Sequence, residues 1–109
     1  QFITAAYVTK IMLHSESTHP SLQYINGGRG GSVIYSDAVS SIRFYFEFGG
    51  GDCVAIIFIP ADDEWEKETG RSVNERASII RFVATQALHD QVSNGSFQIS
   101  EQSIELYRR

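Results

Sequence analysis

The sequence lacks the residues that would build a cross-linked, membrane-spanning or secreted protein. It has a single cysteine, Cys53, so no disulfide can form within the chain. No apolar run approaches the roughly 20 residues that cross a bilayer, which argues against a membrane partner. The first residues show neither the basic segment nor the small-residue cleavage pattern of a secretory signal. Because a lone thiol also suits a reducing compartment, we expect a cytoplasmic protein.

Positive charge is scarce as well. Nine Lys and Arg residues stand against 13 Asp and Glu, which gives a net charge of −4. The excess lies in one block, residues 62–68, where the acidic side chains outnumber the single Lys67 by four. Phosphate binding needs clustered Lys and Arg, so we expect no nucleic-acid partner. The members of this acidic block are Asp62, Asp63, Glu64, Glu66 and Glu68.

A chain of 109 residues, 42% of them hydrophobic, is expected to form one domain over 1–109 with one core. The clearest element is a helix over residues 72–92. Ser72 and Glu75 have the spacing of a capping box, and the apolar residues that follow recur at helical intervals. These residues are Val73, Ala77, Ile80, Ala84, Ala87 and Leu88.

Two strands precede that helix. Residues 42–48 alternate between apolar and polar side chains, as in a strand with one buried face. Residues 53–59 are almost uninterruptedly apolar, which predicts a central strand covered on both faces. Gly49-Gly50-Gly51-Asp52 between them predicts a hairpin turn. Residues 22–25 and 32–35 are predicted as shorter strands.

Three other segments complete the pattern. Residues 62–69 predict a short helix with Asp62 or Asp63 as N-cap and Gly70 as the left-handed residue that ends it. Residues 97–99 and 104–107 predict a last strand or a small hairpin. Thr4 to Ser15 fits either a helix or a strand, and helix is the preferred interpretation. The expected fold class is α+β: an antiparallel sheet of four to five strands, with one long amphipathic helix and one or two shorter helices on one face.

Two surfaces are candidate interfaces. Arg43, Tyr45 and Glu47 form the non-core face of the strand over 42–48, and two predicted helices cannot cover both faces of the sheet. On the long helix, Phe82 lies opposite Ile80 and so falls on the polar side. Cover for its ring must come from elsewhere in the chain or from another subunit. The polar side also carries Gln86 and His89, which complete this second candidate surface.

Residues with reactive side chains form no specific motif. The glycine-rich segment 26–31 matches neither phosphate-binding pattern and predicts a hairpin turn. His14, His19 and His89 have no structural zinc spacing, so no metal site and no cofactor are expected. Cys53 is expected to pack as a small core residue rather than act as a nucleophile. The acidic block either stabilises the start of a helix or meets a basic protein surface.

The second half of the chain resembles a known group of proteins. The segment 65–70, Trp-Glu-Lys-Glu-Thr-Gly, is followed by Arg76, Ile79, residues 82–84 and residues 104–107. This pattern resembles small uncharacterised bacterial α+β proteins, including orphans carried on mobile gene cassettes. The resemblance implies a fold, a bacterial setting and frequent oligomers, and it transfers no site.

These observations leave three functional hypotheses. The first is a non-enzymatic binding protein that forms a homodimer through one of the two candidate surfaces. The second is an immunity or inhibitor protein whose acidic block meets a basic toxin or enzyme. The third is a small-molecule carrier or enzyme with a pocket between the sheet and the long helix.

Overall fold

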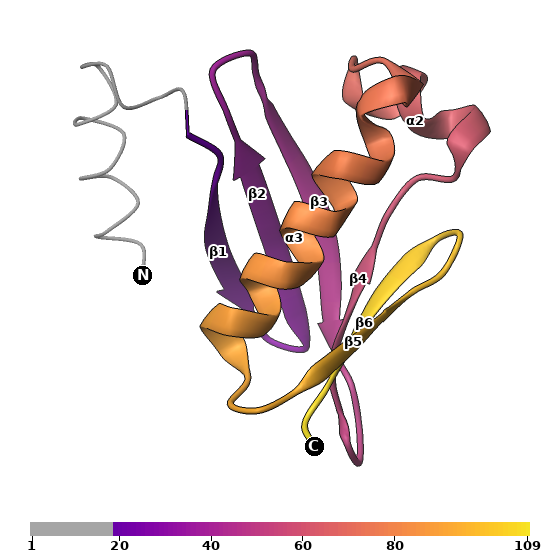
Figure 1. The fold of residues 1–109 in the computed structure, drawn as a ribbon. Coiled ribbons are helices and arrows are strands. Elements are labelled where there is room, and N and C mark those ends of the chain that lie inside the picture. Colours follow the sequence, from indigo (N-terminus) through magenta and orange to yellow (C-terminus); the bar gives the residue numbers. More distant parts are fainter. Residues whose placement is uncertain (1–18) are drawn as a thin grey trace.

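The computed structural model describes residues 19–109, which form a six-stranded antiparallel sheet with one long helix across one face (Figure 1). The strands lie in the order β1-β2-β3-β4-β6-β5. The predicted α+β class is therefore confirmed, whereas the predicted number of strands was too low. The elements are β1 (Ser21–Gly27), β2 (Gly30–Ser36), β3 (Ser41–Phe48), β4 (Cys53–Phe58), α2 (Asp62–Thr69), α3 (Arg76–Gln91), β5 (Ser96–Ile99) and β6 (Ser103–Tyr107).

The additional strand comes from the C-terminal segment, where the second predicted alternative, a small hairpin, is what forms. The C-terminal segment is a hairpin, and its second strand, β6, pairs with β4, so that β5 becomes an edge strand. The β1-β2 hairpin forms the other edge and turns through Gly28, which has a φ of 62°. A Cβ on Gly31 would lie 1.9 Å from the carbonyl oxygen of Ile25, so the backbones pack too closely there for a side chain. The glycine-rich segment is thus the predicted hairpin turn. The expected element over residues 4–15 lies outside the described residues.

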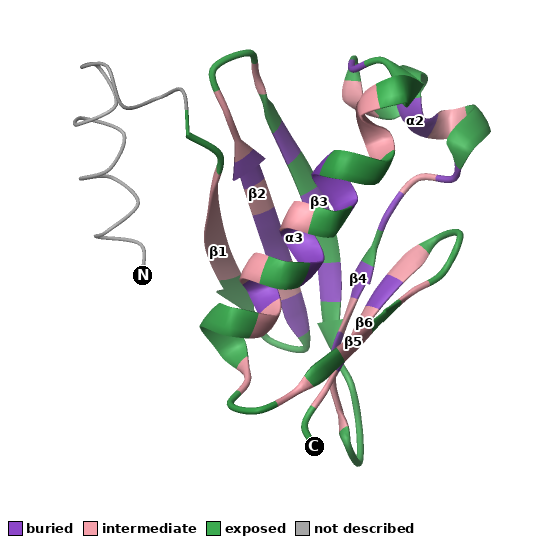
Figure 2. Cartoon of the chain, viewed as in Figure 1, coloured by how far each residue is buried: buried purple, intermediate pink, exposed green. Residues whose placement is uncertain are grey.

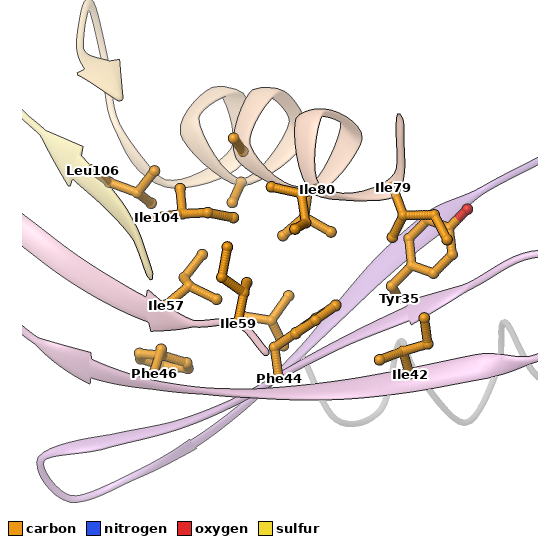
Figure 3. Packing of buried hydrophobic residues seen from close by; sticks show 14 of the residues in the cluster. Tyr35, Ile42, Phe44, Phe46, Ile57, Ile59, Ile79, Ile80, Ile104 and Leu106 are labelled. Atoms are coloured by element: carbon orange, nitrogen blue, oxygen red, sulfur yellow. The ribbon is translucent and has the colours of Figure 1, made fainter. Parts of the chain in front are cut away.

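The core lies between the sheet and α3 (Figures 2 and 3). Ile42, Phe44 and Phe46 of β3 all point into it, as the alternation of that strand predicts. Ile57 of β4, Ile59 just after it and Ile104 of β6 continue this layer across the sheet, and α3 covers it from above with a stripe of apolar side chains. The buried residues of α3 are Ile79, Ile80, Val83, Ala84 and Ala87.

The start of the long helix differs from the prediction. The chain first forms a 3-10 turn at Val73–Glu75, and the α-helix begins at Arg76. The hydroxyl of Ser72 accepts a hydrogen bond from the backbone N–H of Asn74 at 3.1 Å, one residue earlier than a capping box requires. The carboxylate of Glu75 accepts a hydrogen bond from the side chain of Arg71 at 2.6 Å, and a backbone hydrogen bond from Ser72 also lowers the pKa of this carboxyl group. Arg71 is therefore an additional partner of Glu75 that the capping-box spacing does not indicate.

The short helix α2 ends as predicted at Gly70, which has a φ of 75°. Its N-cap is Ala61, whose side chain makes no capping bond, so the prediction of Asp62 or Asp63 was wrong by one or two residues. Trp65 secures α2 to the domain. Its ring is fully buried, stacks on Phe44 at 6.3 Å between ring centres, and donates a 3.0 Å hydrogen bond to the carbonyl oxygen of Ser72.

Candidate binding surface

The face of the sheet opposite α3 carries the first predicted surface. Arg43, Tyr45 and Glu47 alternate with the buried residues of β3 and are all exposed, with 61% of Tyr45 accessible to solvent. No helix among residues 19–109 covers this face, because α3 lies on the other side (Figures 1 and 2). We refer to the exposed surface around these three residues as the open face.

Neighbouring strands add apolar side chains to the open face. Ile34 of β2 lies opposite Arg43, and Ile56 of β4 lies opposite Glu47. Both are half-buried, and the nearby Phe58 is 43% exposed. The prediction that β4 is covered on both faces was therefore wrong: its apolar residues line the core on one side and the open face on the other. The open face thus combines aromatic and aliphatic groups with charges of both signs.

A split in the sheet lies beside the open face. β3 pairs with β4 through three residues only, Phe46–Phe48, whereas it pairs with β2 along seven. Beyond Phe58 the chain follows the β5-β6 loop instead, since Ile59 N–H donates a 3.0 Å hydrogen bond to the carbonyl oxygen of Gln102. A groove of about 450 Å³ opens where the strands part. Its walls are the first half of β3, the segment Phe58–Ala61 and the side chains of Glu64, Glu68 and Thr69.

The acidic block does not act as one surface. Asp62 pairs with Arg76 at 2.9 Å, and the carboxylate of Glu66 accepts a hydrogen bond from the backbone N–H of Val73 at 2.9 Å. Glu64 and Glu68, four residues apart on α2, line the groove. Asp63 is exposed and is not among the residues that line it. Two members therefore have structural partners, and two face the groove.

The second predicted surface, on α3, is divided by the fold. Phe82 is partly buried, and its ring packs edge-on against Tyr35 at 5.8 Å between centres, so cover within the chain accounts for much of its position. Gln86 donates a 2.8 Å hydrogen bond to Asp90, whose other carboxylate oxygen accepts one from the Tyr24 hydroxyl at 2.6 Å. His89 is exposed. Burial, together with the bond to Asp90, raises the pKa of the Tyr24 hydroxyl well above its ordinary value.

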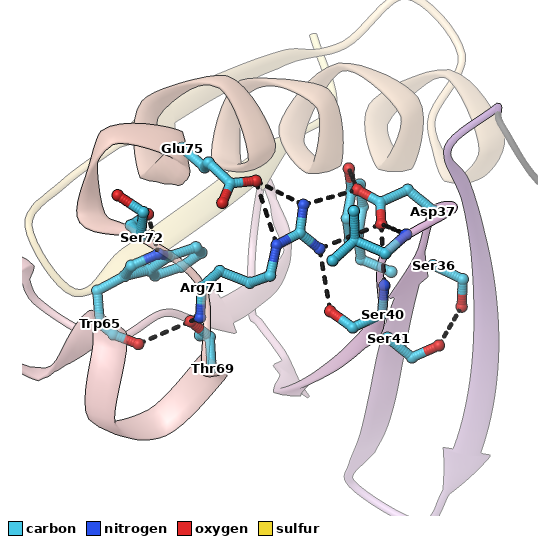
Figure 4. Close-up of polar contacts among 11 residues, drawn as sticks. Ser36, Asp37, Ser40, Ser41, Trp65, Thr69, Arg71, Ser72 and Glu75 are labelled. Carbon is cyan, nitrogen blue, oxygen red and sulfur yellow. Dashed lines mark hydrogen bonds and ion pairs between the residues drawn. The ribbon is translucent and has the colours of Figure 1, made fainter.

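The most elaborate polar cluster was not identified from the sequence (Figure 4). Arg71, only 6% exposed, binds both carboxylate oxygens of Asp37, at 2.9 and 3.1 Å, and one oxygen of Glu75 at 2.6 Å. Hydrogen bonds from Arg71 hold the pKa values of both carboxyl groups below their ordinary range, and the two carboxylates hold the pKa of Arg71 above its own. The Tyr35 hydroxyl also donates to Asp37, and burial with this bond raises the pKa of Tyr35 to about 12.

This Arg71 cluster joins the β2-β3 turn to the segment between α2 and α3. Asp37 also accepts hydrogen bonds from the backbone N–H groups of Val39 and Ser40, so its carboxylate is held from several sides. No buried side-chain nitrogen or oxygen among residues 19–109 lacks a hydrogen-bond partner, and a fully satisfied cluster of this kind is typical of a structural connection. Arg71 follows the predicted helix end at Gly70, but nothing in the local sequence indicates its distant partner Asp37, 34 residues away.

Other classes of site find little support in residues 19–109. No group of three or more potential metal-ligating side chains comes together there. Cys53 is half-buried, and its thiol lies 3.7 Å from the carbonyl oxygen of Ala55. None of the helices described is both long and apolar enough to cross a bilayer.

The open face and the adjoining groove are therefore the candidate site. Comparison with known proteins adds no assignment: the chain matches no family model, no curated protein and no solved structure.

Proposed function

We propose that this protein acts by binding rather than by catalysis, and that it works as a homodimer joined through the open face of its sheet. The observation that carries the proposal is the arrangement of charge around Tyr45. Arg43 and Glu47 lie two residues before and after it on the same face of β3, so a positive and a negative group stand on either side of an aromatic centre.

Such an arrangement is complementary to itself. If two open faces meet around a two-fold axis that crosses β3 at Tyr45, the strands run in opposite directions, and Arg43 of each copy faces Glu47 of the other. A two-fold interface is formed by the same patch on both subunits, so one strand can supply both members of each ion pair. The half-buried Ile34 and Ile56 add apolar area to the centre.

The size of the face is adequate for this purpose. Six strands at about 4.8 Å spacing and about 20 Å length give a flat area of about 580 Å² for the whole sheet face before the relief of the side chains is counted. A standard interface buries about 800 Å² of accessible surface on each partner, which is of the same order. A contact centred on Tyr45 would thus use the open face and most of the rest of the sheet face opposite α3.

Charge reversal provides the direct test. Arg43→Glu and Glu47→Arg should each weaken the dimer by about tenfold or more, because like charges then face each other across the axis. The double variant carrying both changes should restore dimerisation, since the two charges have merely exchanged places. The measurement is the dissociation constant of the dimer from sedimentation equilibrium or from light scattering across a concentration series.

Val39→Ser is the matched control, because Val39 is 73% exposed on the β2-β3 turn and lies outside the open face. It should leave the dissociation constant unchanged. A wild-type chain that remains monomeric at high concentration would refute the dimer, and a double variant as weak as the single ones would refute the two-fold arrangement.

A further inference from the structure

We propose that the groove between β3 and α2 binds an extended, basic peptide segment of another protein, which pairs with the backbone of β3 as an added strand. This goes beyond self-association, because it assigns a second partner, of different chemistry, to a groove that overlaps the open face only at its edge. The groove has three properties that favour such a partner: backbone groups of β3 without a neighbouring strand on one side, sufficient room and two carboxylates.

The unpaired strand follows from the hydrogen-bond pattern of β3. Phe48 N–H donates to Arg29 on the β2 side, and Asp37 N–H bonds to Ser40 at the other end of the same hairpin. Backbone groups alternate from side to side along an antiparallel strand, so Phe44 directs its N–H and C=O toward β2, whereas Arg43 directs them toward β4. The β3-β4 ladder nevertheless begins only at Phe46. Within residues 19–109, no strand takes the backbone groups of Arg43 on that side.

An unpaired strand of this kind is a template for pairing with another chain. Added strands gain affinity from main-chain hydrogen bonds and specificity from pockets that hold alternate side chains. The unpaired side of Arg43 lies inside the sheet, beside the groove. The volume of the groove, about 450 Å³, falls within the usual range for binding clefts. Tyr45 and Phe58 offer aromatic surface at its edge.

The charge of the far wall specifies the partner. Glu64 and Glu68 project into the groove from α2. Glu64 has only a loose contact with Lys67, at 4.0 Å, where the Lys67 side chain is 80% exposed and the Glu64 side chain 47%. Arg43, on the near wall, binds the hydroxyl of Ser32 at 3.3 Å. A strand lying along β3 therefore has two carboxylates opposite it, and a Lys or Arg side chain is the natural complement.

The groove and the dimer contact share Tyr45 and Phe58. A bound peptide and a second copy of the chain should therefore exclude each other. Binding is best measured at protein concentrations below the dimer dissociation constant, where this competition is weak. Failure of one proposal then leaves the other standing, because self-association is measured without peptide and peptide binding is measured on the monomer.

The probe is a fluorescently labelled octapeptide of alternating Lys and Val with blocked ends, and the readout is fluorescence anisotropy. It should bind, and raising the salt concentration should weaken it. Glu68→Gln should lower the affinity about two- to fivefold, the range expected for one partly exposed ion pair, and Glu64→Gln with Glu68→Gln should lower it further. Asp63→Asn removes the same charge from α2 outside the groove and should have little effect.

Amide hydrogen exchange followed by NMR tests the mode of binding. The backbone N–H of Arg43 should exchange faster than that of Phe44 in the protein alone, and it should become protected when the peptide binds. Two N-methylated peptides complete the test, one methylated at the Lys residues and the other at the Val residues. Only the peptide whose methyl groups replace the N–H groups that point toward β3 should lose affinity. Binding without protection of Arg43, or equal binding of a Glu-Val peptide, would overturn the proposal, as would absence of binding.

Discussion

The two faces of one strand, β3, show how the chain separates stability from surface chemistry. Phe44 is 2% exposed and contacts Trp65, whereas its neighbour Tyr45 is 61% exposed on the opposite face. Both are aromatic and adjacent in sequence, so neither composition nor strand propensity distinguishes them. The difference is that α3 and α2 cover one face and leave the other without cover. Burial, rather than residue type, therefore decides which aromatic ring stabilises the fold.

The largest effect is expected on the covered face. Phe44→Ala should lower the free energy of unfolding by about 3–5 kcal/mol, because it removes a buried ring and leaves a cavity against Trp65. Urea denaturation followed by circular dichroism measures this loss. An effect as small as that of a surface substitution would show that the two faces do not differ as their burial indicates.

A somewhat smaller loss is expected at the polar edge of the covered face. Arg71→Ala should cost about 3 kcal/mol, since it leaves the Asp37 carboxylate, 14% exposed, without its ion pair. Lys67→Ala is the control, because the pair of Lys67 with Glu64 is exposed and should contribute little. If Arg71→Ala combined with Asp37→Asn is no more stable than Arg71→Ala alone, the unpaired charge is not the cause of the loss.

Lowering the pH should also destabilise the protein through the Arg71 cluster. The pKa values of Asp37 and Glu75 lie below their ordinary range in the folded protein, so the unfolded chain takes up these protons first as the pH falls. Their contribution to stability is complete above about pH 5 and declines progressively below about pH 4. Thermal melting between pH 2 and 7 should show this decline. Asp37→Asn should make it shallower, and an unchanged slope would contradict the assignment.

The smallest effect on stability is expected on the open face. Tyr45→Ala should change the free energy of unfolding of the monomer by about 0.5 kcal/mol or less, because the side chain is already largely in water. Its effect on the dimer dissociation constant should be much larger, about tenfold or more, since a central aromatic residue often dominates an interface. A large loss of monomer stability would show that Tyr45 contributes to the stability of the fold as Phe44 does, and the two faces of β3 would then not differ in this respect.

Much of the candidate site could be predicted from local patterns. The alternation of residues 42–48 places Arg43, Tyr45 and Glu47 on one face, and the structure confirms that assignment. The groove could not be predicted. It depends on where β4 leaves β3 to follow the β5-β6 loop, and that choice involves residues more than 40 positions apart. The positions of Glu64 and Glu68 along the groove follow from the same departure.

Sequence periodicity alone determined the helices, most of the strands and the buried stripe of α3, because side chains repeat every 3.6 residues in a helix and every two in a strand. The local pattern failed wherever a distant partner competed. Arg71 binds Asp37, 34 residues away, and Phe82 on the polar side of α3 packs against Tyr35. Only the tertiary structure decided the order of the strands, the Arg71 cluster and the split in the sheet. The physical reason is that cross-strand pairing and ion pairing depend on which surfaces meet, and spacing along the chain does not encode that.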